Sequence, residues 1–481
     1  MSQKTMSRSA DVAVSGGPAD QRLVSALTLA AMSLGYGVVQ LDVTIVNVAI
    51  NSIGASFGSA VAGLQWVVSA YTIAFASFIL SAGALGDRVG AKRVFMAGFA
   101  VFTLASLGCA LAPSMPVLIG SRALQGLGAA VLVPNSLALL NHAYPDDEAR
   151  GRAVGTWAAG ASIALTTGPL VGGGLIEAFG WRSIFLVNLP IGLLGLWLVW
   201  RYATDTPEDK SREVDFPGQI TAVVALGVLA GALIEGGAAG WTNRWVLFGF
   251  GAAAALAGVF IVLERRSTQP MLPLGLFRER TFSATSAGGL LVNIAFYGLI
   301  FVFSLYFQRV NDLSVLWTGL AFVPMTAACF GANLIAGRVS GRIGARTTIM
   351  IGSALMAAAC LALLPIDKGV GYVWQSGPFL VMGAGLGLLV PPLTFALLGS
   401  VDKARSGIAS GVLNASRQAG SLLGVALFGS FLASSQLMIH GARMALAISA
   451  GLLIAACVVV FAGVGRRVGA PRRTRPTLLS H

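Results

Sequence analysis

Charged side chains are scarce in this sequence. Asp, Glu, Lys and Arg make up 11% of its 481 residues, whereas a soluble domain carries roughly 25% charged residues. Hydrophobic residues make up 56%, and the mean hydropathy is +0.80. The chain therefore has too few charges to cover a folded surface with water-facing side chains. This shortage excludes an ordinary soluble protein and predicts that the surplus apolar surface faces lipid.

Acidic residues are the scarcer of the two charge signs. The chain has 19 Asp and Glu against 32 Lys and Arg, which gives a net charge of +13. A basic excess can indicate a nucleic acid partner. The basic residues lie in short segments between apolar runs rather than along one stripe, so we expect no nucleic acid partner.

Cysteine and histidine are also rare, with four and three residues respectively. The cysteines all fall inside apolar runs, where cysteine behaves as a small buried hydrophobe. We therefore expect neither disulfides nor a metal site. The four cysteines are Cys109, Cys329, Cys360 and Cys457.

Long apolar runs dominate what is present. A helix that spans a membrane needs about 20 apolar residues, and the sequence contains fourteen such runs. They cover residues 23–49, 63–84, 94–112, 115–140, 153–176, 183–202, 217–237, 245–263, 282–307, 315–337, 347–365, 372–398, 407–433 and 444–465.

The basic residues alternate along these runs and predict an orientation. Twenty-five of them fall in segments on the side of the N-terminus, five fall on the other side, and Arg122 and Arg417 lie within runs. Cytoplasmic loops of membrane proteins carry the excess of Lys and Arg. The bias predicts a multi-pass protein of the inner (plasma) membrane with both termini in the cytoplasm.

An internal repeat relates two parts of the chain. Gly83–Lys92 resembles Gly337–Arg346 at an offset of 254 residues, and two further matches have offsets of 255 and 257. Transporter halves are often related by such repeats. The matched runs lie eight spans apart, so we expect an all-α integral membrane fold of two six-helix bundles separated by two inserted helices. The expected segments are a cytoplasmic tail (1–22), an N-terminal bundle (23–202), an inserted pair with linkers (203–280), a C-terminal bundle (281–465) and a basic cytoplasmic tail (466–481).

Two charged residues of opposite sign lie deep in the apolar runs. At 1.5 Å per residue, Arg122 lies about one or two turns below the outer face, and Asp42 lies at a similar depth. A charge inside a membrane helix is expensive and usually functional. We expect the two residues to meet, directly or through water, as the site of proton coupling, because loss of a cationic neighbour favours a protonated carboxyl. The alternatives are a static ion pair between helices or a snorkelling arginine.

A charged, glycine-rich segment follows the second run. Its glycines permit a tight turn between packed helices, and Asp87 and Arg88 can pair across the helix ends or cap them. The plain alternative is an ordinary basic loop. The order of residues resembles the cytoplasmic motif of the major facilitator superfamily, which implies a gating latch; in the second copy Gly341 replaces Asp87, so we expect no Asp-dependent latch there. The residues of the expected latch are Gly83, Gly86, Asp87, Arg88, Gly90 and Lys92.

The fifth run ends in a glycine- and proline-rich segment. Gly168, Pro169, Gly172 and Gly173 permit a kink and close contact with a neighbouring helix. Helix packing alone is one interpretation. The order Gly-Pro-x-x-Gly-Gly also resembles the motif of antiporters within the superfamily, which importers usually lack, and this resemblance implies export.

Three further segments resemble the fourteen-span drug:proton antiporter family, and the resemblance covers residues 23–465. It rests on Leu41–Ile50, Trp181–Gly192 and Asn414–Gly420, although Asn51 stands where the family usually has proline. Residues 233–241 and 270–278 are similar to the branch that contains the methylenomycin A resistance exporter. The resemblance implies a major facilitator fold and antiport of protons against drugs, antibiotics or related amphipathic compounds by alternating access. It implies no cofactor beyond the proton motive force.

Several polar and aromatic residues are candidates for the cavity. Arg417 lies near the middle of the thirteenth run, where it either binds helix carbonyls or contacts a substrate or a carboxylate across the cavity. The candidate cavity or substrate residues are Asn47, Gln125, Tyr71, Tyr297, Asn414 and Arg417.

Other functions of a polytopic chain remain as alternatives. A metabolite or nutrient carrier of the same fold would have the same spans, but the Gly168–Pro169 pair argues against it. A membrane-embedded enzyme would need paired carboxylates, a histidine cluster or a Ser/His set within the spans, and the apolar runs contain none. A channel or receptor does not explain the duplicated bundles. We expect a monomeric carrier whose partners are the lipid bilayer, protons and a small-molecule substrate.

Overall fold

The computed structural model describes residues 18–209, 215–367, 371–402, 405–432 and 438–465, and these residues form helices and no strands. The N-terminal half contains α1 (Pro18–Phe57), α2 (Val61–Val89), α3 (Ala91–Ala110), α4 (Met115–Ala143), α5 (Asp147–Phe179), α6 (Ser183–Leu186) and α7 (Asn188–Tyr202). The inserted segment contains α8 (Phe216–Ala239), α9 (Arg244–Arg266) and the short 3-10 helix η1 (Leu274–Arg278). The C-terminal half contains α10 (Arg280–Arg309), α11 (Val315–Ala321), α12 (Val323–Ile343), α13 (Ala345–Leu363), α14 (Tyr372–Leu398), α15 (Ser406–Ser430) and α16 (Met438–Gly463).

Each of the fourteen predicted runs corresponds to a helix or to a pair of consecutive helices. The sixth run is divided into α6 and α7, and the tenth into α11 and α12. A proline follows each break, Pro190 and Pro324 respectively, and proline lacks the N–H that would bond to the carbonyl four residues earlier. The predicted tail at residues 466–481 and most of the one at 1–22 lie outside the described residues.

Thirteen helical stretches of the described chain are long and apolar enough to cross a membrane. The remaining predicted span is α15, which has 25 residues but carries Asn414, Arg417 and Gln418 in its middle. It packs against α2, α8 and α10. Neighbouring helices therefore separate this less apolar span from the lipid.

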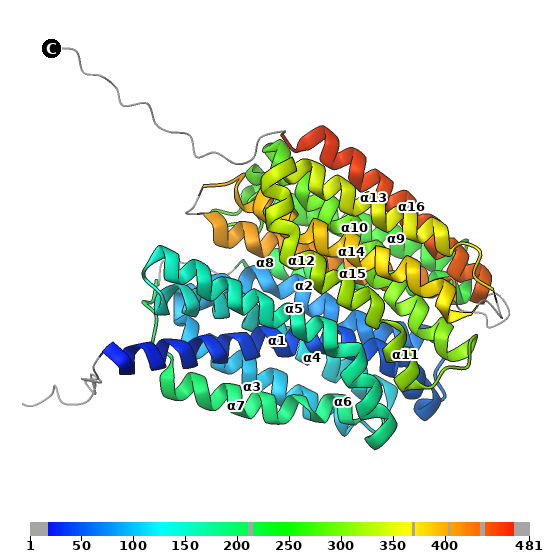
Figure 1. Cartoon of the computed structure of the whole chain (residues 1–481), viewed down its shortest axis with the longest axis horizontal. Coiled ribbons are helices and arrows are strands. Elements are labelled where there is room, and N and C mark those ends of the chain that lie inside the picture. The colour runs from blue at the N-terminus through cyan, green and yellow to red at the C-terminus, as the bar shows by residue number, and fades with distance from the viewer. Residues whose placement is uncertain (1–17, 210–214, 368–370, 403–404, 433–437, 466–481) are drawn as a thin grey trace, which may run out of the picture.

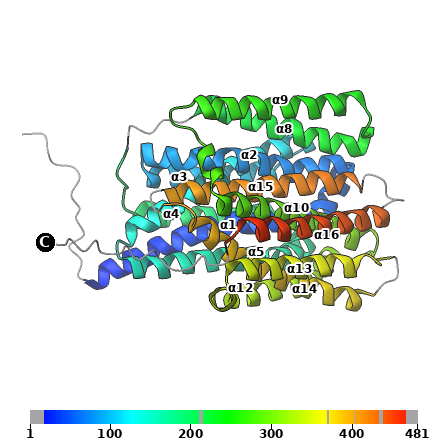
Figure 2. The same cartoon turned by 90° about the horizontal axis from the view of Figure 1, so that it is seen from above.

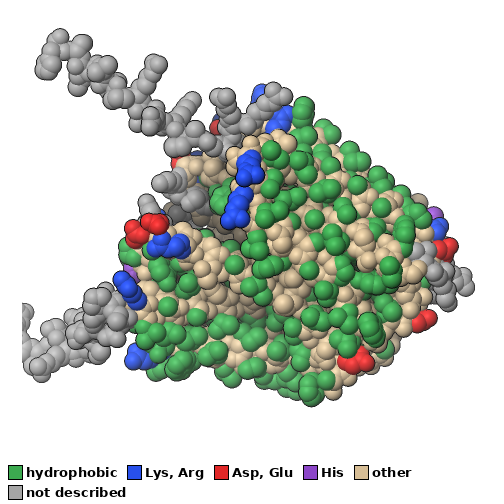
Figure 3. Space-filling model, viewed as in Figure 1, with side chains coloured by type: hydrophobic (Ala, Val, Ile, Leu, Met, Phe, Trp, Pro, Cys, Tyr) green, Lys and Arg blue, Asp and Glu red, His purple; other side chains and the backbone are tan. Residues whose placement is uncertain are grey.

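The two halves lie side by side with their helices running along the long axis (Figure 1). α1 begins and α16 ends toward the same side of the bundle, as an even number of crossings requires. Lys and Arg gather toward that side, and a broad face between the two ends is mostly apolar (Figure 3). This distribution fits a band of lipid around the middle of the bundle.

The internal repeat is visible in the helix packing. Gly126 of α4 lies against the backbone of Tyr71 on α2, and its repeat partner Gly383 of α14 lies against the backbone of Met325 on α12. In each case a side chain would collide with the backbone of the neighbouring helix, so glycine is what permits the close approach.

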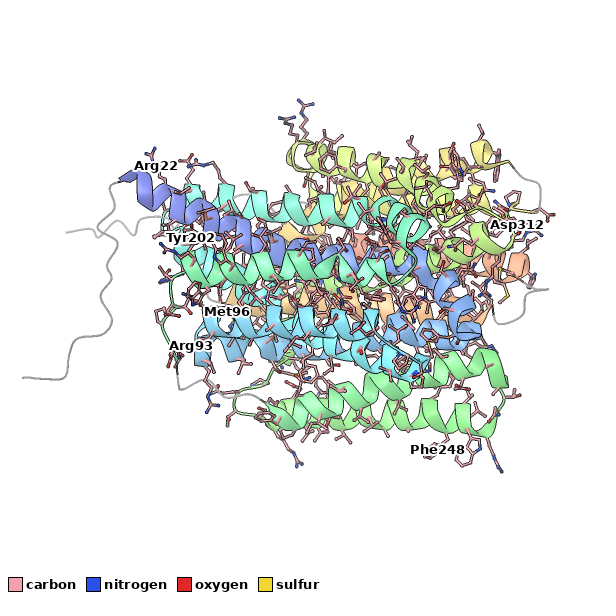
Figure 4. The ribbon with its side chains drawn as sticks, turned by 90° about the horizontal axis from the view of Figure 1, so that it is seen from below. Arg22, Arg93, Met96, Tyr202, Phe248 and Asp312 are labelled. Carbon is pink, nitrogen blue, oxygen red and sulfur yellow. The ribbon has the colours of Figure 1, made fainter. Side chains whose placement is uncertain are left out.

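The inserted pair lies at one flank of the bundle, outside α2 and α15 (Figure 2). Ala230 of α8 packs in a small buried cluster with Ile73 of α2 and Leu422 of α15. α8 therefore fills the seam between the two halves. α9 packs on α8 and presents apolar side chains such as Phe248, 69% exposed, on the outside of the molecule (Figure 4).

Candidate functional site

Asp42 and Arg122 meet in the interior of the N-terminal half. Nη1 of Arg122 on α4 donates to Oδ2 of Asp42 on α1 at 2.5 Å. Asp42 is fully buried, and Arg122 is 1% exposed. The structure thus brings together the two deep charges that the sequence singled out, and removing either one leaves a buried charge without its partner.

Polar side chains surround the carboxylate of Asp42. Gln125 donates to its Oδ1 at 2.8 Å and to Ser106 Oγ at 2.8 Å, and it accepts from Arg122 Nη1 at 2.6 Å. Asn188, at the start of α7, donates to the same Oδ1 at 3.4 Å and to Ser106 at 3.2 Å. Four helices, α1, α3, α4 and α7, therefore supply one connected network of buried polar groups.

The guanidinium of Arg122 also contacts α2. Its carbon Cζ lies 4.3 Å from the ring centroid of Tyr71, and its Nε donates to the carbonyl oxygen of Val67 at 3.2 Å. Both contacts come from α2. An arginine with a carboxylate, an amide, a carbonyl and an aromatic face has the partners that burial demands.

A small pocket connects this network to the C-terminal half. It has a volume of about 10 Å³, and its lining includes Asn47, Tyr71 and Arg122 from one half and Tyr297 and Ser421 from the other. That volume is near the lower limit for one water molecule. The structure therefore places three candidate residues, Asn47, Tyr71 and Tyr297, at the boundary between the halves beside Arg122.

A larger cavity of about 690 Å³ lies at the end of the bundle where α2 ends and α15 begins. Apolar side chains such as Leu80, Leu137 and Trp157 line it, together with Asn414 of α15 and Asp215 of the inserted pair. A volume of this size suits a drug-sized molecule. The candidate residue Asn414 thus faces a cavity.

The two halves touch one another at the opposite end. Ser304 of α10 donates to the carbonyl of Asn47 at 2.6 Å, and Gln65 of α2 donates to the carbonyls of Val425 and Ala426 at 3.0 and 2.7 Å. Arg309 of α10 donates to Oδ1 of Asn51 at 2.8 Å. The structure is therefore open at the end with the large cavity and closed at the other.

The Gly-Pro segment of α5 takes part in this closed end. Gly168 and Gly172 lie against α1, at Thr44 and Ile45, and a Cβ on Gly173 would lie 3.0 Å from the Cα of Leu316 on α11. Pro169 is within the helix, and its carbonyl lies against Gly319 of α11. The motif thus packs one half directly on the other, which agrees with the helix-packing interpretation and places that packing at the contact between the halves.

The glycine-rich turn between α2 and α3 forms as predicted. Gly90 has φ +97°, which favours glycine, and Gly86 lies against the side chain of Asn135 on α4. Arg88, in the last turn of α2, and Lys92, in the first turn of α3, lie on either side of Gly90.

The linker that follows α7 folds back over this turn. Thr206 Oγ1 accepts from the backbone N–H of Ala91 at 2.7 Å, the N–H of Asp209 donates to the carbonyl of Asp87 at 2.8 Å, and Glu208 pairs with Arg93 at 2.6 Å. The sequence predicted only that this segment is a linker. Its contacts with the α2–α3 turn instead form a clamp on the segment where the latch is predicted.

Arg417 lies between helices of the C-terminal half. Its Nη2 donates to Oγ1 of Thr394 on α14 at 3.0 Å, and the side chain is partly buried. It therefore bonds to a side-chain hydroxyl, whereas the sequence left open a contact with helix carbonyls or with a substrate or carboxylate across the cavity. Among the residues that the structure describes, no group of three or more His, Cys, Asp or Glu is placed to hold a metal ion.

The sequence profile of the Major Facilitator Superfamily matches residues 32–425. The chain belongs to this superfamily. Its relatives include the methylenomycin A resistance protein of Streptomyces coelicolor, which is 38% identical over 87% of this chain and 88% of that protein. The multidrug resistance protein Stp of Mycobacterium tuberculosis is 40% identical over 85% of this chain and 76% of its own length. This superfamily member is a multi-pass membrane transporter.

Solved structures agree on the major facilitator fold. A bacterial homologue of the human lysosomal transporter Spinster, in an inward-facing and unoccupied conformation, superposes with a TM-score of 0.67 at 17% identity over 93% of this chain and 98% of that one. A D-xylose-proton symporter gives a TM-score of 0.66 at 15% identity over 92% and 98%. The predicted fold is therefore confirmed.

Two members of the Asp42 network in this major facilitator protein were not predicted as site residues. Ser106 and Asn188 are both fully buried and both contact the ion-pair network. Asn188 had a visible signal, because it is a lone amide within the apolar run 183–202. Ser106 had none, since single serines are common in membrane helices.

Proposed function

We propose that this transporter is a proton-coupled antiporter that exports drugs, antibiotics or related small amphipathic compounds. Relatives at 36–40% identity are named as methylenomycin A resistance and multidrug resistance proteins. The apolar cavity of about 690 Å³ is of a size for such compounds. The proposal of proton coupling rests on the buried pair of Asp42 and Arg122.

The proposed cycle is alternating access between the two halves. With Asp42 on α1 ionised, its charge holds Arg122 and the amide of Gln125 on α4 and the amide of Asn188 on α7. A proton on Asp42 removes the charge that Arg122 neutralises, so the network loses its strongest contact and the helices that share it are free to shift. Contacts at the closed end, including that of Gly173 with α11, then separate while the cavity end closes.

The clamped α2–α3 turn has a place in the same cycle. In the proposal it is the latch at the cytoplasmic end, and the linker 203–209 holds it in the state described. The protein acts as a monomer, with no cofactor beyond the proton motive force. Both termini lie in the cytoplasm, so the large cavity faces the cytoplasm of the cell.

The test is an efflux assay in an efflux-deficient host, with a panel of compounds and a proton uncoupler. We expect uncoupler-sensitive efflux from the wild type and its loss in Asp42→Asn, while Glu148→Gln, which neutralises an exposed carboxylate, keeps it. Full proton-coupled efflux in Asp42→Asn would refute the proton-site assignment. Accumulation of a nutrient without export of any compound would instead favour a metabolite carrier of the same fold.

A further inference from the structure

Two acidic side chains of the inserted segment meet beside the large cavity. Asp215 precedes α8, and Glu264 lies in the last turn of α9. Because α8 and α9 run antiparallel, these two positions come together although they are 49 residues apart in sequence. Asp215 lines the cavity, and Glu264, which is 3% exposed, lies behind it.

Each carboxylate uses one oxygen for local structure. Oδ1 of Asp215 accepts from the backbone N–H of Gly218 at 2.9 Å and so caps α8. Oε2 of Glu264 accepts from the N–H of Leu272 at 2.9 Å and so anchors the linker after α9. These contacts explain why both residues are acceptors, but a neutral amide would serve equally well at either position.

The second oxygen of each carboxylate is buried and has no partner. Oδ2 of Asp215 and Oε1 of Glu264 make no hydrogen bond within the described chain. A Cβ built on Gly218 would lie 2.8 Å from each of them, so the two oxygens are no farther apart than twice that distance. Both oxygens therefore lie close to Gly218, whose lack of a side chain permits their approach.

Within the part of the chain that the structure describes, the pair also has no counter-ion. No described Lys or Arg forms an ion pair with either carboxylate, and the adjacent Arg265 and Arg266 are exposed. Two buried carboxylate oxygens side by side are costly unless a proton or another positive charge joins them. An ammonium group carries one such charge and three donors but no acceptor, which matches two acceptor oxygens.

We propose that Asp215 and Glu264 bind the protonated amino group of a substrate while its apolar part lies in the cavity. This inference rests on the proposed export function and names one substrate class for it, the amphipathic monocationic amine. The amine enters past Asp215, with its apolar body against Leu80, Met271 and Leu276, which line the same cavity. The site belongs to the inserted segment, whereas the proton-coupling pair belongs to the N-terminal half.

The test compares a fluorescent naphthylalkylamine with its neutral N-acetyl derivative. The purified full chain carries Asp215→Asn or Glu264→Gln, which keep the two structural acceptors and remove the charge. We expect each variant to weaken binding and export of the amine by roughly tenfold, as loss of a charge-assisted contact does, and to leave the neutral amide within about twofold. The matched control is Glu148→Gln, whose carboxylate is exposed.

A third variant tests the geometry without changing charge. Gly218→Ala places a methyl group between the two oxygens and should also weaken binding of the amine selectively. Equal losses for amine and amide, or no loss for the amine in any of the three variants, would overturn the inference. Failure of the proposed function is a separate result, because it would appear as absence of proton-coupled export of either probe by the wild type, while binding to the purified protein still reports on the acidic pair.

Discussion

Arg122 donates a 2.5 Å hydrogen bond to Asp42 at a depth where neither residue is more than 1% exposed. The two residues are 80 positions apart in the sequence. Their contact joins the first helix of the N-terminal half to the fourth. Because the pair is both buried and ionic, experiments can separate its contribution to the stability of the protein from its role in proton coupling.

Loss of Asp42 alone should destabilise the protein, and loss of both charges should not. Asp42→Leu leaves Arg122 as an unpaired buried charge, which costs about 3–5 kcal/mol. Asp42→Leu combined with Arg122→Met removes both charges, so we expect most of that stability to return. Thermal unfolding in detergent measures the difference. Proton-coupled efflux should stay absent in the double variant; its recovery would show that the pair is only structural.

The contact of Gly173 with α11 predicts a gate at the closed end. Gly173→Val introduces two methyl groups where even a Cβ alone would lie 3.0 Å from the Cα of Leu316, and overpacking of this kind costs about 1–3 kcal/mol. We expect slower efflux and faster labelling of a Ser304→Cys reporter by a membrane-impermeant thiol reagent. The control is Gly174→Val, since Gly174 has open space around it. Equal effects of the two substitutions would argue against a gate at this contact.

The clamp on the α2–α3 turn predicts a local loss of stability in Thr206→Val. The hydroxyl of Thr206 accepts from Ala91 at the first turn of α3, and loss of such a cap costs about 1 kcal/mol. Hydrogen exchange at the Ala91 amide should become roughly fivefold faster. Thr156→Val is the control, because that exposed hydroxyl bonds within its own helix. Unchanged exchange at Ala91 would show that the linker does not hold the turn.

The close contact of α8 with α15 predicts that the inserted pair matters for stability. A Cβ on Gly237 would lie 2.6 Å from the Cα of Ser430, so Gly237→Leu should push α8 away from the seam at a cost of about 1–3 kcal/mol. Gly227→Leu, on the same helix in open space, should be tolerated. Thermal unfolding and efflux rates report the two effects. Tolerance of Gly237→Leu would mean that α8 is only loosely attached.

The positions of the spanning segments and the meeting of Asp42 with Arg122 were predictable from the sequence. Apolar runs fix which segments cross the membrane, and the rise per residue fixes the depth of each charge. Gln125 was named only as a candidate for the cavity, and the structure places it one turn after Arg122 in the same network. The Gly-Pro segment was identified by its residue order, but its partner α11 depends on how the two halves pack.

The clamp and the acidic pair were not predictable by the same means. The linker 203–209 has no periodic pattern, so nothing in it indicates that Thr206 and Asp209 return to the α2–α3 turn. The sequence predicted α8 and α9 as an inserted pair of helices. Whether Asp215 and Glu264 face one another depends on the rotation of each helix about its axis, and helices that are apolar all round carry little information about that rotation.

α8 is tied to opposite partners at its two ends. At its start, Gln219 accepts from Ser81 at 2.6 Å and donates to the carbonyl of Ser77 at 3.0 Å, both on α2, whereas near its end Gly237 lies against Ser430 of α15. The helix therefore crosses the seam diagonally and links α2 of one half to α15 of the other. A link of this kind lets the two halves rotate about the seam but resists their sliding or moving apart. A molecule bound at the start of α8, beside the large cavity, would therefore act directly on the axis of that rotation.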